Sequence, residues 1–230
     1  MEERKKAESM SMEGLVEHAC HFSANVFAGR RDKFEALVAG QHPEILMITC
    51  SDSRILPELL TQADAGDLFV LRNAGNIVPA HGAGCGGEQA TIEYALAALG
   101  VRHVIVCGHS HCGAMKGLLH PELVQGMPRV AGWLAHAEAA HSILSERQQD
   151  LGEDERLLQA AKENVVVQMA NLETYPAVRA RRARGELQIH GWVYLIETGE
   201  VLSYEPQSGE FGPLFSPSRP AATRARSADR

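Results

Sequence analysis

The chain has 230 residues, of which 45% are hydrophobic and 22% are charged, and its formal net charge is -7 at pH 7. This length and composition suffice for one globular domain with a sizeable buried core. The mixed, net negative charge provides no general basic surface, so we expect neither nucleic acid nor anionic membrane as a partner. Residues 1–11 are polar and no run of 18 apolar residues occurs, so we predict no signal peptide, no membrane span and a cytoplasmic location.

Two helices are expected before the first strand. The first is indicated by apolar residues at helical spacing between Leu15 and Phe27, and the second covers residues 32–39 and ends at Gly40. Residues 44–50 then form a continuous apolar run, which is typical of a strand buried on both faces of a parallel sheet. The sequence therefore predicts an N-terminal helical arm followed by a central strand.

Strands and helices alternate in the middle of the chain. A strand at residues 67–72 is followed by a glycine-rich loop through Gly87, a helix at 88–99, a strand at 102–107 and a further helix after Gly113. We interpret the glycine-rich loop as a flexible connection, because it matches no phosphate-binding pattern. The alternation predicts an α/β domain with a mostly parallel central sheet and flanking helices.

The last third of the chain combines helices with a hairpin. Residues 129–173 are helical in pattern, with an interruption near Gly152, and a short helix begins at Pro176. Residues 187–196 and 201–205 flank Thr198-Gly199, which predicts a hairpin that adds a strand to the sheet. We therefore expect one domain at residues 1–211 and, at 212–230, a flexible tail rich in Pro, Ser, Ala and Arg.

Polar side chains follow two of the predicted strands, where ligands gather in open α/β sheets. Cys50 ends one apolar run, and His109 and Cys112 follow another. Two thiolates and an imidazole suit zinc, and three protein ligands leave one position open for water or substrate. A hydrolase with a cysteine nucleophile is the alternative, in which His109 would act as the base.

The remaining cysteines and histidines carry no comparable pattern. Single cysteines in such positions are usually small buried residues, which is our interpretation of Cys20, Cys85 and Cys107, and the odd total of five cysteines argues against a disulfide framework. The spacing of the other histidines, among them His81, His111 and His141, marks no proton relay.

Asp52 and Arg54 stand two residues apart directly after Cys50. In an extended segment their side chains point the same way and can form a forked ion pair. Beside a zinc site, a carboxylate held by a guanidinium stays ionised and can accept a hydrogen bond from water. Asp52 is therefore the candidate general base, and Arg54 is the residue that holds it.

The pattern C-x-D-x-R at residues 50–54, followed by H-x-x-C-G at 109–113, resembles the β-class carbonic anhydrases. The likeness extends over residues 14–205, and it is greatest to the plant-like branch of the family and its cyanobacterial members. Further segments that resemble the family are residues 40–41, 69–73, 92–95 and 117–119. The branch that carries a regulatory bicarbonate site has Trp and Gly where this chain has Met47 and Thr49, so we expect no such site.

The resemblance implies that Cys50, His109 and Cys112 bind Zn2+. It also implies that Asp52 accepts a proton from the metal-bound water, that Arg54 orients Asp52, and that Gln41 and the backbone of Gly113 contact substrate oxygen. Members of the family form homodimers, or larger oligomers built from them, with active sites at the interface. Gln41, Phe69 and Tyr94 would then reach the site of the partner subunit. From the residues alone, Phe69 and Tyr94 are equally compatible with core packing and Gln41 with a plain loop residue.

The reaction implied is the reversible hydration of carbon dioxide to bicarbonate and a proton by zinc-bound hydroxide, which makes the chain a zinc lyase, a carbonate dehydratase. Two alternatives remain open. A hydrolase of carbonyl sulfide or carbon disulfide would use the same zinc fold, and a non-enzymatic scaffold protein would close a structural zinc with a fourth ligand. The sequence also leaves open whether the protein is packaged in a carboxysome.

Overall fold

The structure, a computed structural model, describes residues 10–84, 86–147 and 150–214. The chain divides into two units, residues 1–41 and residues 42–230. The helices of the first unit are α1 (Met12–Phe22), the π-helix η1 (Ser23–Phe27), the 3-10 helix η2 (Ala28–Arg30) and α2 (Arg31–Val38).

The first unit is the helical arm that the sequence predicts. The Oγ of Ser11 caps α1 by accepting a hydrogen bond of 3.1 Å from the amide of Gly14. The ring of Phe34 lies against those of Phe22 and Phe27, with centroid distances of 6.0 and 5.3 Å. No described residue of the unit is buried within it. The described part of the arm, residues 10–41, therefore has a small aromatic contact of its own but no core.

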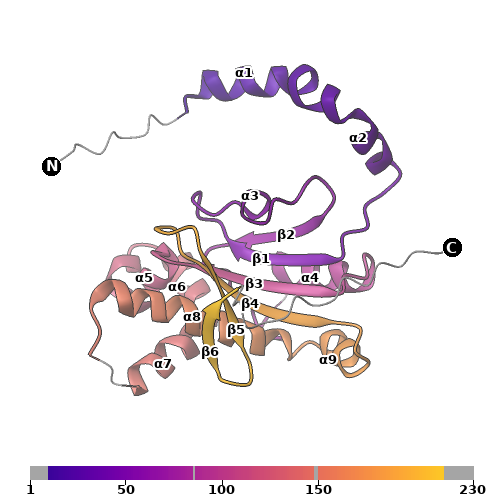
Figure 1. The fold of residues 1–230 in the computed structure, drawn as a ribbon. Coiled ribbons are helices and arrows are strands. Elements are labelled where there is room, and N and C mark those ends of the chain that lie inside the picture. Colours follow the sequence, from indigo (N-terminus) through magenta and orange to yellow (C-terminus); the bar gives the residue numbers. More distant parts are fainter. Residues whose placement is uncertain (1–9, 85, 148–149, 215–230) are drawn as a thin grey trace. The chain divides into compact units, whose positions relative to one another are not determined.

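The second unit is built around a six-stranded sheet with the order β2-β1-β3-β4-β5-β6 (Figure 1). The first four strands in this order run parallel, and β5 and β6 are antiparallel to their neighbours. Burial of the middle strands explains their apolar sequences, since β1 is buried at five of its six positions. The strands are β1 (Ile45–Cys50), β2 (Leu68–Asn73), β3 (His103–His109), β4 (Gln188–Tyr194), β5 (Val201–Glu205) and β6 (Glu210–Pro213).

Helices connect the parallel strands and supply the rest of the core. They are α3 (Pro57–Thr61), α4 (Gly87–Ala97), α5 (Gly113–Leu119), η3 (Pro121–Val124), α6 (Pro128–Leu134), η4 (Ala135–Ala137), α7 (Glu138–Glu146), α8 (Glu153–Leu172) and α9 (Pro176–Ala183). Among the described residues, no helix is both long and apolar enough to cross a membrane.

Alternate residues of β1 and β3 belong to two separate apolar clusters. Met47 and Ile105 pack with α5, α6 and α7, whereas Ile48 and Val106 pack with α4 and α9, and α8 contributes to both clusters. The longest helix, α8, crosses close to the sheet at Gly191, where a Cβ atom would lie only 2.6 Å from Sδ of Met169. Glycine at this position lets the helix pack directly on β4.

The predicted fold class is confirmed: an α/β domain with a mostly parallel sheet, flanking helices, a helical arm and a C-terminal hairpin. Three details differ. Strand β3 continues to His109 rather than ending at residue 107, because β4 pairs with it along its whole length. Helix α3 and strand β6 were not predicted, and β6 includes Gly212 and Pro213, which the sequence had assigned to the tail. Residues 215–230 of that tail lie outside the described residues.

Candidate metal centre

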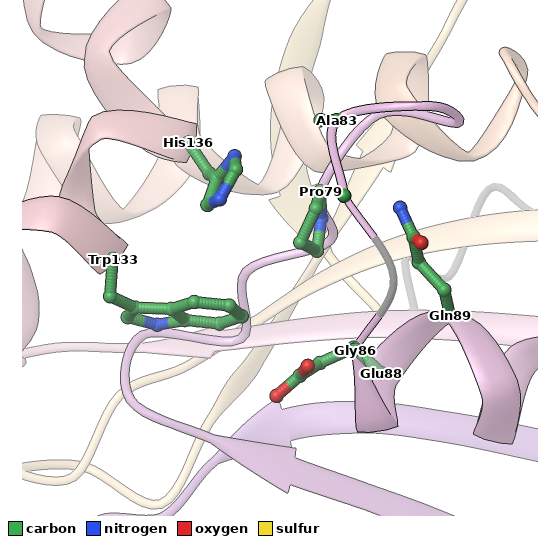
Figure 2. A pocket seen from close by; sticks show the side chains of 8 residues that line it. Pro79, Ala83, Gly86, Glu88, Gln89, Trp133 and His136 are labelled. Carbon is green, nitrogen blue, oxygen red and sulfur yellow. The ribbon is translucent and has the colours of Figure 1, made fainter.

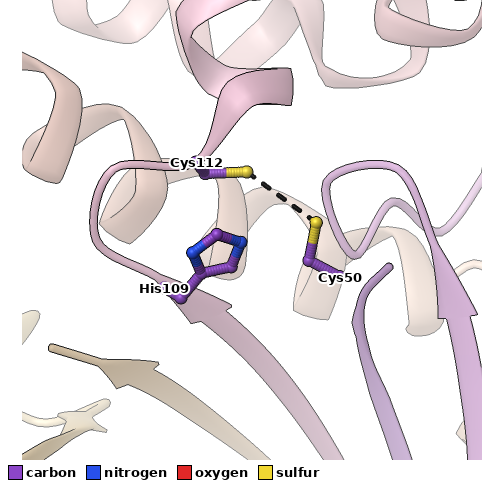
Figure 3. A group of neighbouring side chains, drawn as sticks. All are labelled: Cys50, His109 and Cys112. Carbon is purple, nitrogen blue, oxygen red and sulfur yellow. Dashed lines mark hydrogen bonds between the residues drawn. The ribbon is translucent and has the colours of Figure 1, made fainter. Parts of the chain in front are cut away.

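Three side chains that could hold a metal ion meet at the carboxyl edge of the parallel strands (Figure 3). Cys50 is the last residue of β1, His109 is the last residue of β3, and Cys112 directly precedes α5. All three side chains are buried, and their ligand atoms lie within 4.8 Å of one another. The two sulfur atoms are 4.0 Å apart. The sheet thus brings together residues that are 62 positions apart in the sequence.

His109 presents a free ring nitrogen to the two sulfurs. Its Nδ1 lies 2.8 Å from the backbone oxygen of Ser110, and because a carbonyl only accepts, Nδ1 carries the proton. Nε2 is fully buried and has no hydrogen-bond partner among the described residues. Such an unsatisfied buried nitrogen is costly unless a ligand occupies it. Two thiolates around a tetrahedral zinc would lie about 3.8 Å apart, so the residues present fit this metal.

The two thiols differ in acidity. The pKa of Cys50 lies well below that of an ordinary thiol because Cys112 donates a hydrogen bond to its sulfur, and the amide of Gly75 donates another at 3.3 Å. The pKa of Cys112 is raised well above the ordinary value by the same Cys50 sulfur and by burial. The protein alone therefore favours one thiolate, and a bound dication would favour both.

Asp52 and Arg54 form the predicted forked ion pair next to this group. Nε and Nη2 of Arg54 donate hydrogen bonds of 2.9 and 2.7 Å to the two carboxylate oxygens, and the Arg54 amide donates a third of 3.0 Å. These bonds hold the pKa of Asp52 far below its usual range. The Oδ2 atom of Asp52 is 3.9 Å from Nε2 of His109. The carboxylate is therefore ionised, held in place and close to the metal-binding atoms.

Arg72, which sequence reasoning did not single out, holds the segment that carries Cys50 and Asp52. From β2 its guanidinium donates hydrogen bonds to the backbone oxygens of Cys50, Asp52 and Ile55 at 3.0, 2.8 and 2.9 Å. One side chain thus fixes the path of the loop after β1. The only signal of this role in the sequence was that Arg72 lies next to Asn73 in a segment that resembles the family.

Buried amide side chains of α8 support the loop after β2 in a similar way. The side-chain amide of Asn164 donates a hydrogen bond of 2.9 Å to the backbone oxygen of Gly75, and that of Gln168 donates one of 2.9 Å to Oδ1 of Asn164. The Oε1 of Gln168 in turn accepts a hydrogen bond of 2.9 Å from the amide of Val78. This network orients the loop whose Gly75 amide points at the sulfur of Cys50.

A hollow of about 150 Å³ lies beside the same loop (Figure 2). Trp133 and His136 line one side of it, with ring centroids 5.6 Å apart. Nε1 of Trp133 donates 2.8 Å to the backbone oxygen of Ala74, next to Gly75. The wall of this hollow is therefore a further support of the metal-site loop. The other residues lining the hollow are Pro79, Ala83, Gly84, Gly86, Glu88 and Gln89.

The candidate substrate residues are placed differently from one another. Gly113 begins α5 directly after Cys112, and a Cβ atom on it would meet nothing within 4 Å. Phe69 and Tyr94 contact each other, with ring centroids 6.0 Å apart, and half of the Tyr94 side chain is exposed. Phe69 packs with the apolar cluster of Ile48, not with that of Cys50, so neither aromatic joins the metal group of its own chain. Gln41 belongs to the first unit.

The remaining cysteines fall into three cases. Cys107 is fully buried, as predicted, and burial raises the pKa of its thiol to about 12. Cys20 is exposed within the arm, so the expectation of a buried thiol is wrong there. Its helix has no core of its own to bury it. Cys85 lies outside the described residues.

Comparison with known proteins agrees with this geometry. The family model for carbonic anhydrase matches residues 45–201. A carbonic anhydrase of the cyanobacterium Synechocystis sp. is 51% identical over 195 residues, which cover 84% of this chain and 71% of the relative.

Two solved structures share the fold. The β-carbonic anhydrase CcaA superposes with a TM-score of 0.86 at 49% identity, covering 88% of this chain and 98% of that one. One of two tetrameric β-carbonic anhydrases from Sordaria macrospora matches with a TM-score of 0.72 at 33% identity, covering 82% and 96%. The chain therefore belongs to the β class of the carbonic anhydrase family and is a carbonate dehydratase. Within that class it is close to cyanobacterial members, as the sequence motifs predicted.

Proposed function

We propose that this chain catalyses the reversible, zinc-dependent hydration of carbon dioxide to bicarbonate and a proton at the group formed by Cys50, His109 and Cys112. The observation that carries the proposal is the buried Nε2 of His109, which faces two thiols beside an ionised carboxylate and has no hydrogen-bond partner in the part of the chain that the structure describes. In the reaction, a water oxygen forms a bond to the carbon of carbon dioxide, one C=O π pair moves onto oxygen, and the proton of the water passes by way of Asp52 to solvent.

Zinc held by the two sulfurs and the imidazole would act as a Lewis acid that makes hydroxide available near neutral pH. The protein's own part is to favour the thiolate of Cys50, to which the amide of Gly75 donates a hydrogen bond. The carbonyl of Ser110 keeps the proton of His109 on Nδ1, so that Nε2 faces the sulfurs.

Asp52 is proposed as the group that orients the attacking water and accepts its proton. Three hydrogen bonds from Arg54 hold its carboxylate ionised and in place, with Oδ2 3.9 Å from Nε2 of His109. A water placed between Asp52 and those atoms would find an acceptor that is already in position. Arg54 is thus the positioning residue of this pair.

Substrate contacts are proposed for Gly113, Gln41, Phe69 and Tyr94. The backbone amide of Gly113 would donate to substrate oxygen at the open start of α5. Phe69 and Tyr94 lie together on the other side of the sheet, which suits residues that line the site of a second subunit. We propose a homodimer, or a larger oligomer of dimers, in which Gln41 also crosses to the partner. The first unit, with no described buried residue, supplies exposed apolar side chains for such an interface.

Stopped-flow assays of carbon dioxide and carbonyl sulfide, run side by side on one zinc-loaded preparation, test this proposal. We expect hydration of carbon dioxide to dominate and to disappear when a chelator removes zinc. Faster turnover of carbonyl sulfide would point to a hydrolase instead, and zinc binding without either activity would point to a scaffold protein. The cytoplasmic location stays a prediction that cell fractionation can check.

A further inference from the structure

The loop that carries His109 and Cys112 is held by a turn far away in the sequence. The amide of Ser110 donates 2.9 Å to the backbone oxygen of Tyr194, and the amide of Ile196 donates 2.9 Å to Oγ of Ser110. The hydroxyl of Ser110 in turn donates 2.6 Å to Oε2 of Glu197. Ser110 is 2% exposed, whereas the Glu197 side chain that it reaches is about half-exposed.

The turn between β4 and β5 that supplies these partners is itself well ordered by hydrogen bonds. The amide of Leu195 donates a hydrogen bond of 2.8 Å to the backbone oxygen of Glu200, and the amide of Gly199 donates one of 2.8 Å to the backbone oxygen of Leu195. Gly199 adopts a positive φ of 77°. Such a closed turn offers Glu197 at a defined position. Its carboxylate is a fixed acceptor, and the hydroxyl of Ser110 lowers the pKa of Glu197, so the acceptor stays ionised.

Ser110 connects this turn to the metal-binding ring. Its backbone oxygen is the atom that accepts the proton of His109 Nδ1 at 2.8 Å. A shift of Ser110 would therefore rotate the imidazole, so that Nε2 no longer faces the two sulfurs, or it would allow the proton to leave Nδ1. The carboxylate of Glu197 also lies 3.6 Å from Nε2 of His111, the next residue of the loop.

We propose that Glu197 is a positioning residue of the metal centre, which acts through the hydroxyl of Ser110 to fix the orientation of the His109 ring. The proposal rests on the proposed function in that the group held in place is the metal-binding one. Arg54 holds the same loop at the next residue, since its Nη2 donates a hydrogen bond of 2.9 Å to the backbone oxygen of His111.

Three variants and a matched control test the proposal. Glu197→Ala and Ser110→Ala each remove the side-chain hydrogen bond, whereas Glu197→Gln keeps an acceptor for the Ser110 hydroxyl. Glu200→Ala is the control, because Glu200 belongs to the same exposed turn but its carboxylate accepts from Thr198 instead. Metal release to a chromogenic chelator and the visible absorption spectrum of the cobalt-substituted protein are measured, with the thermal unfolding midpoint as a check on folding.

We expect zinc release to be about tenfold faster in Glu197→Ala and in Ser110→Ala, with a changed cobalt spectrum in both. Glu197→Gln should show a smaller effect, and Glu200→Ala should match the wild type. Wild-type release and an unchanged spectrum in the folded Glu197→Ala variant would overturn the proposal, as would an equal effect of Glu200→Ala.

A second readout does not depend on zinc or on activity. Nitrogen-proton NMR spectra of histidine-labelled protein report which ring nitrogen of His109 carries the proton. We expect protonated Nδ1 in the wild type and a mixture of tautomers in Glu197→Ala. If the wild-type chain bound no zinc, the proposed function would fail, but this spectrum would still show whether Glu197 positions the His109 ring.

Discussion

Nη2 of Arg54 lies 2.7 Å from Oδ2 of Asp52, and the same nitrogen donates to the backbone oxygen of His111. One guanidinium therefore links the candidate base to the loop between two metal-binding residues. Because Asp52 is 3.9 Å from Nε2 of His109, a carboxylate released from Arg54 could move onto the metal-binding atoms. Under the proposed function, we therefore expect Arg54 to keep Asp52 off the metal, so that one coordination position stays open.

Replacing Arg54 with alanine should lower the rate of hydration by tenfold or more while leaving about one zinc per chain. Zinc content and stopped-flow rate are measured on the same sample, with Arg179→Ala, an exposed residue of α9, as the control. Loss of zinc together with activity would make Arg54 a structural support, and full activity would show that catalysis does not need the ion pair.

Replacing Arg72 with lysine should lower the free energy of unfolding by about 2 kcal/mol, because an ammonium cannot reproduce hydrogen bonds from a guanidinium to three backbone oxygens. Zinc affinity should fall with it, since Cys50 lies in the segment that Arg72 holds. Urea unfolding and zinc titration measure the two effects, and Arg179→Lys serves as the control. Wild-type values for both would show that the loop holds its path without Arg72.

The fold and the metal-binding group were largely predictable from the sequence. The continuous apolar run before Cys50 identified a central parallel strand, and strand ends in such sheets meet at one edge, which placed Cys50 near His109. We predicted the end of β3 too early because Gly108 and His109 carry no strand signal. Their pairing with Val193 and Tyr194 of β4 extends the strand to His109.

The residues that support the metal site were not predictable in this way. Ser110 and Glu197 are 87 positions apart, and Asn164 is 89 positions from Gly75. Their side chains meet only after the sheet and α8 have packed, and no local periodicity reports such contacts. Strand β6 was missed for a related reason, since Gly212 and Pro213 resemble a loop and become a strand only by pairing with β5.

Replacing Gln41 with alanine should slow hydration by about tenfold without removing zinc, because an amide donor to substrate oxygen is lost while the metal-binding residues stay intact. Gln125→Ala, at an exposed position after η3, is the control. Steady-state hydration rates and zinc content are measured for both. Unchanged kinetics in Gln41→Ala would leave Gln41 as an ordinary loop residue.

Cys107 should be inert to thiol reagents in the folded protein, whereas Cys20 should react, because Cys107 is fully buried and Cys20 is exposed. Alkylation followed by mass spectrometry of the peptides measures this, with urea-unfolded protein as the control in which both react. Rapid labelling of Cys107 under native conditions would contradict its burial.

The same thiol should make stability depend on pH. The folded pKa of Cys107 is raised to about 12, while the unfolded thiol ionises near about 8.5, so only the unfolded state loses this proton between those values. The free energy of unfolding should therefore fall as pH rises through this window. In urea unfolding at about pH 8 to 10, which overlaps that window, the free energy of unfolding should decrease less steeply for Cys107→Ala than for the wild type. Parallel curves would mean that Cys107 already ionises in the folded protein.

The most direct test of the account measures zinc content and carbon dioxide hydration together on the wild type and on Cys112→Ala, with Cys20→Ala as the matched control. The wild type and Cys20→Ala should each bind about one zinc per chain and hydrate carbon dioxide, and Cys112→Ala should lose most of both, because a tetrahedral site with one sulfur fewer holds zinc poorly. A folded Cys112→Ala protein that retained zinc and full activity would contradict the assignment of Cys50, His109 and Cys112 as the catalytic metal centre.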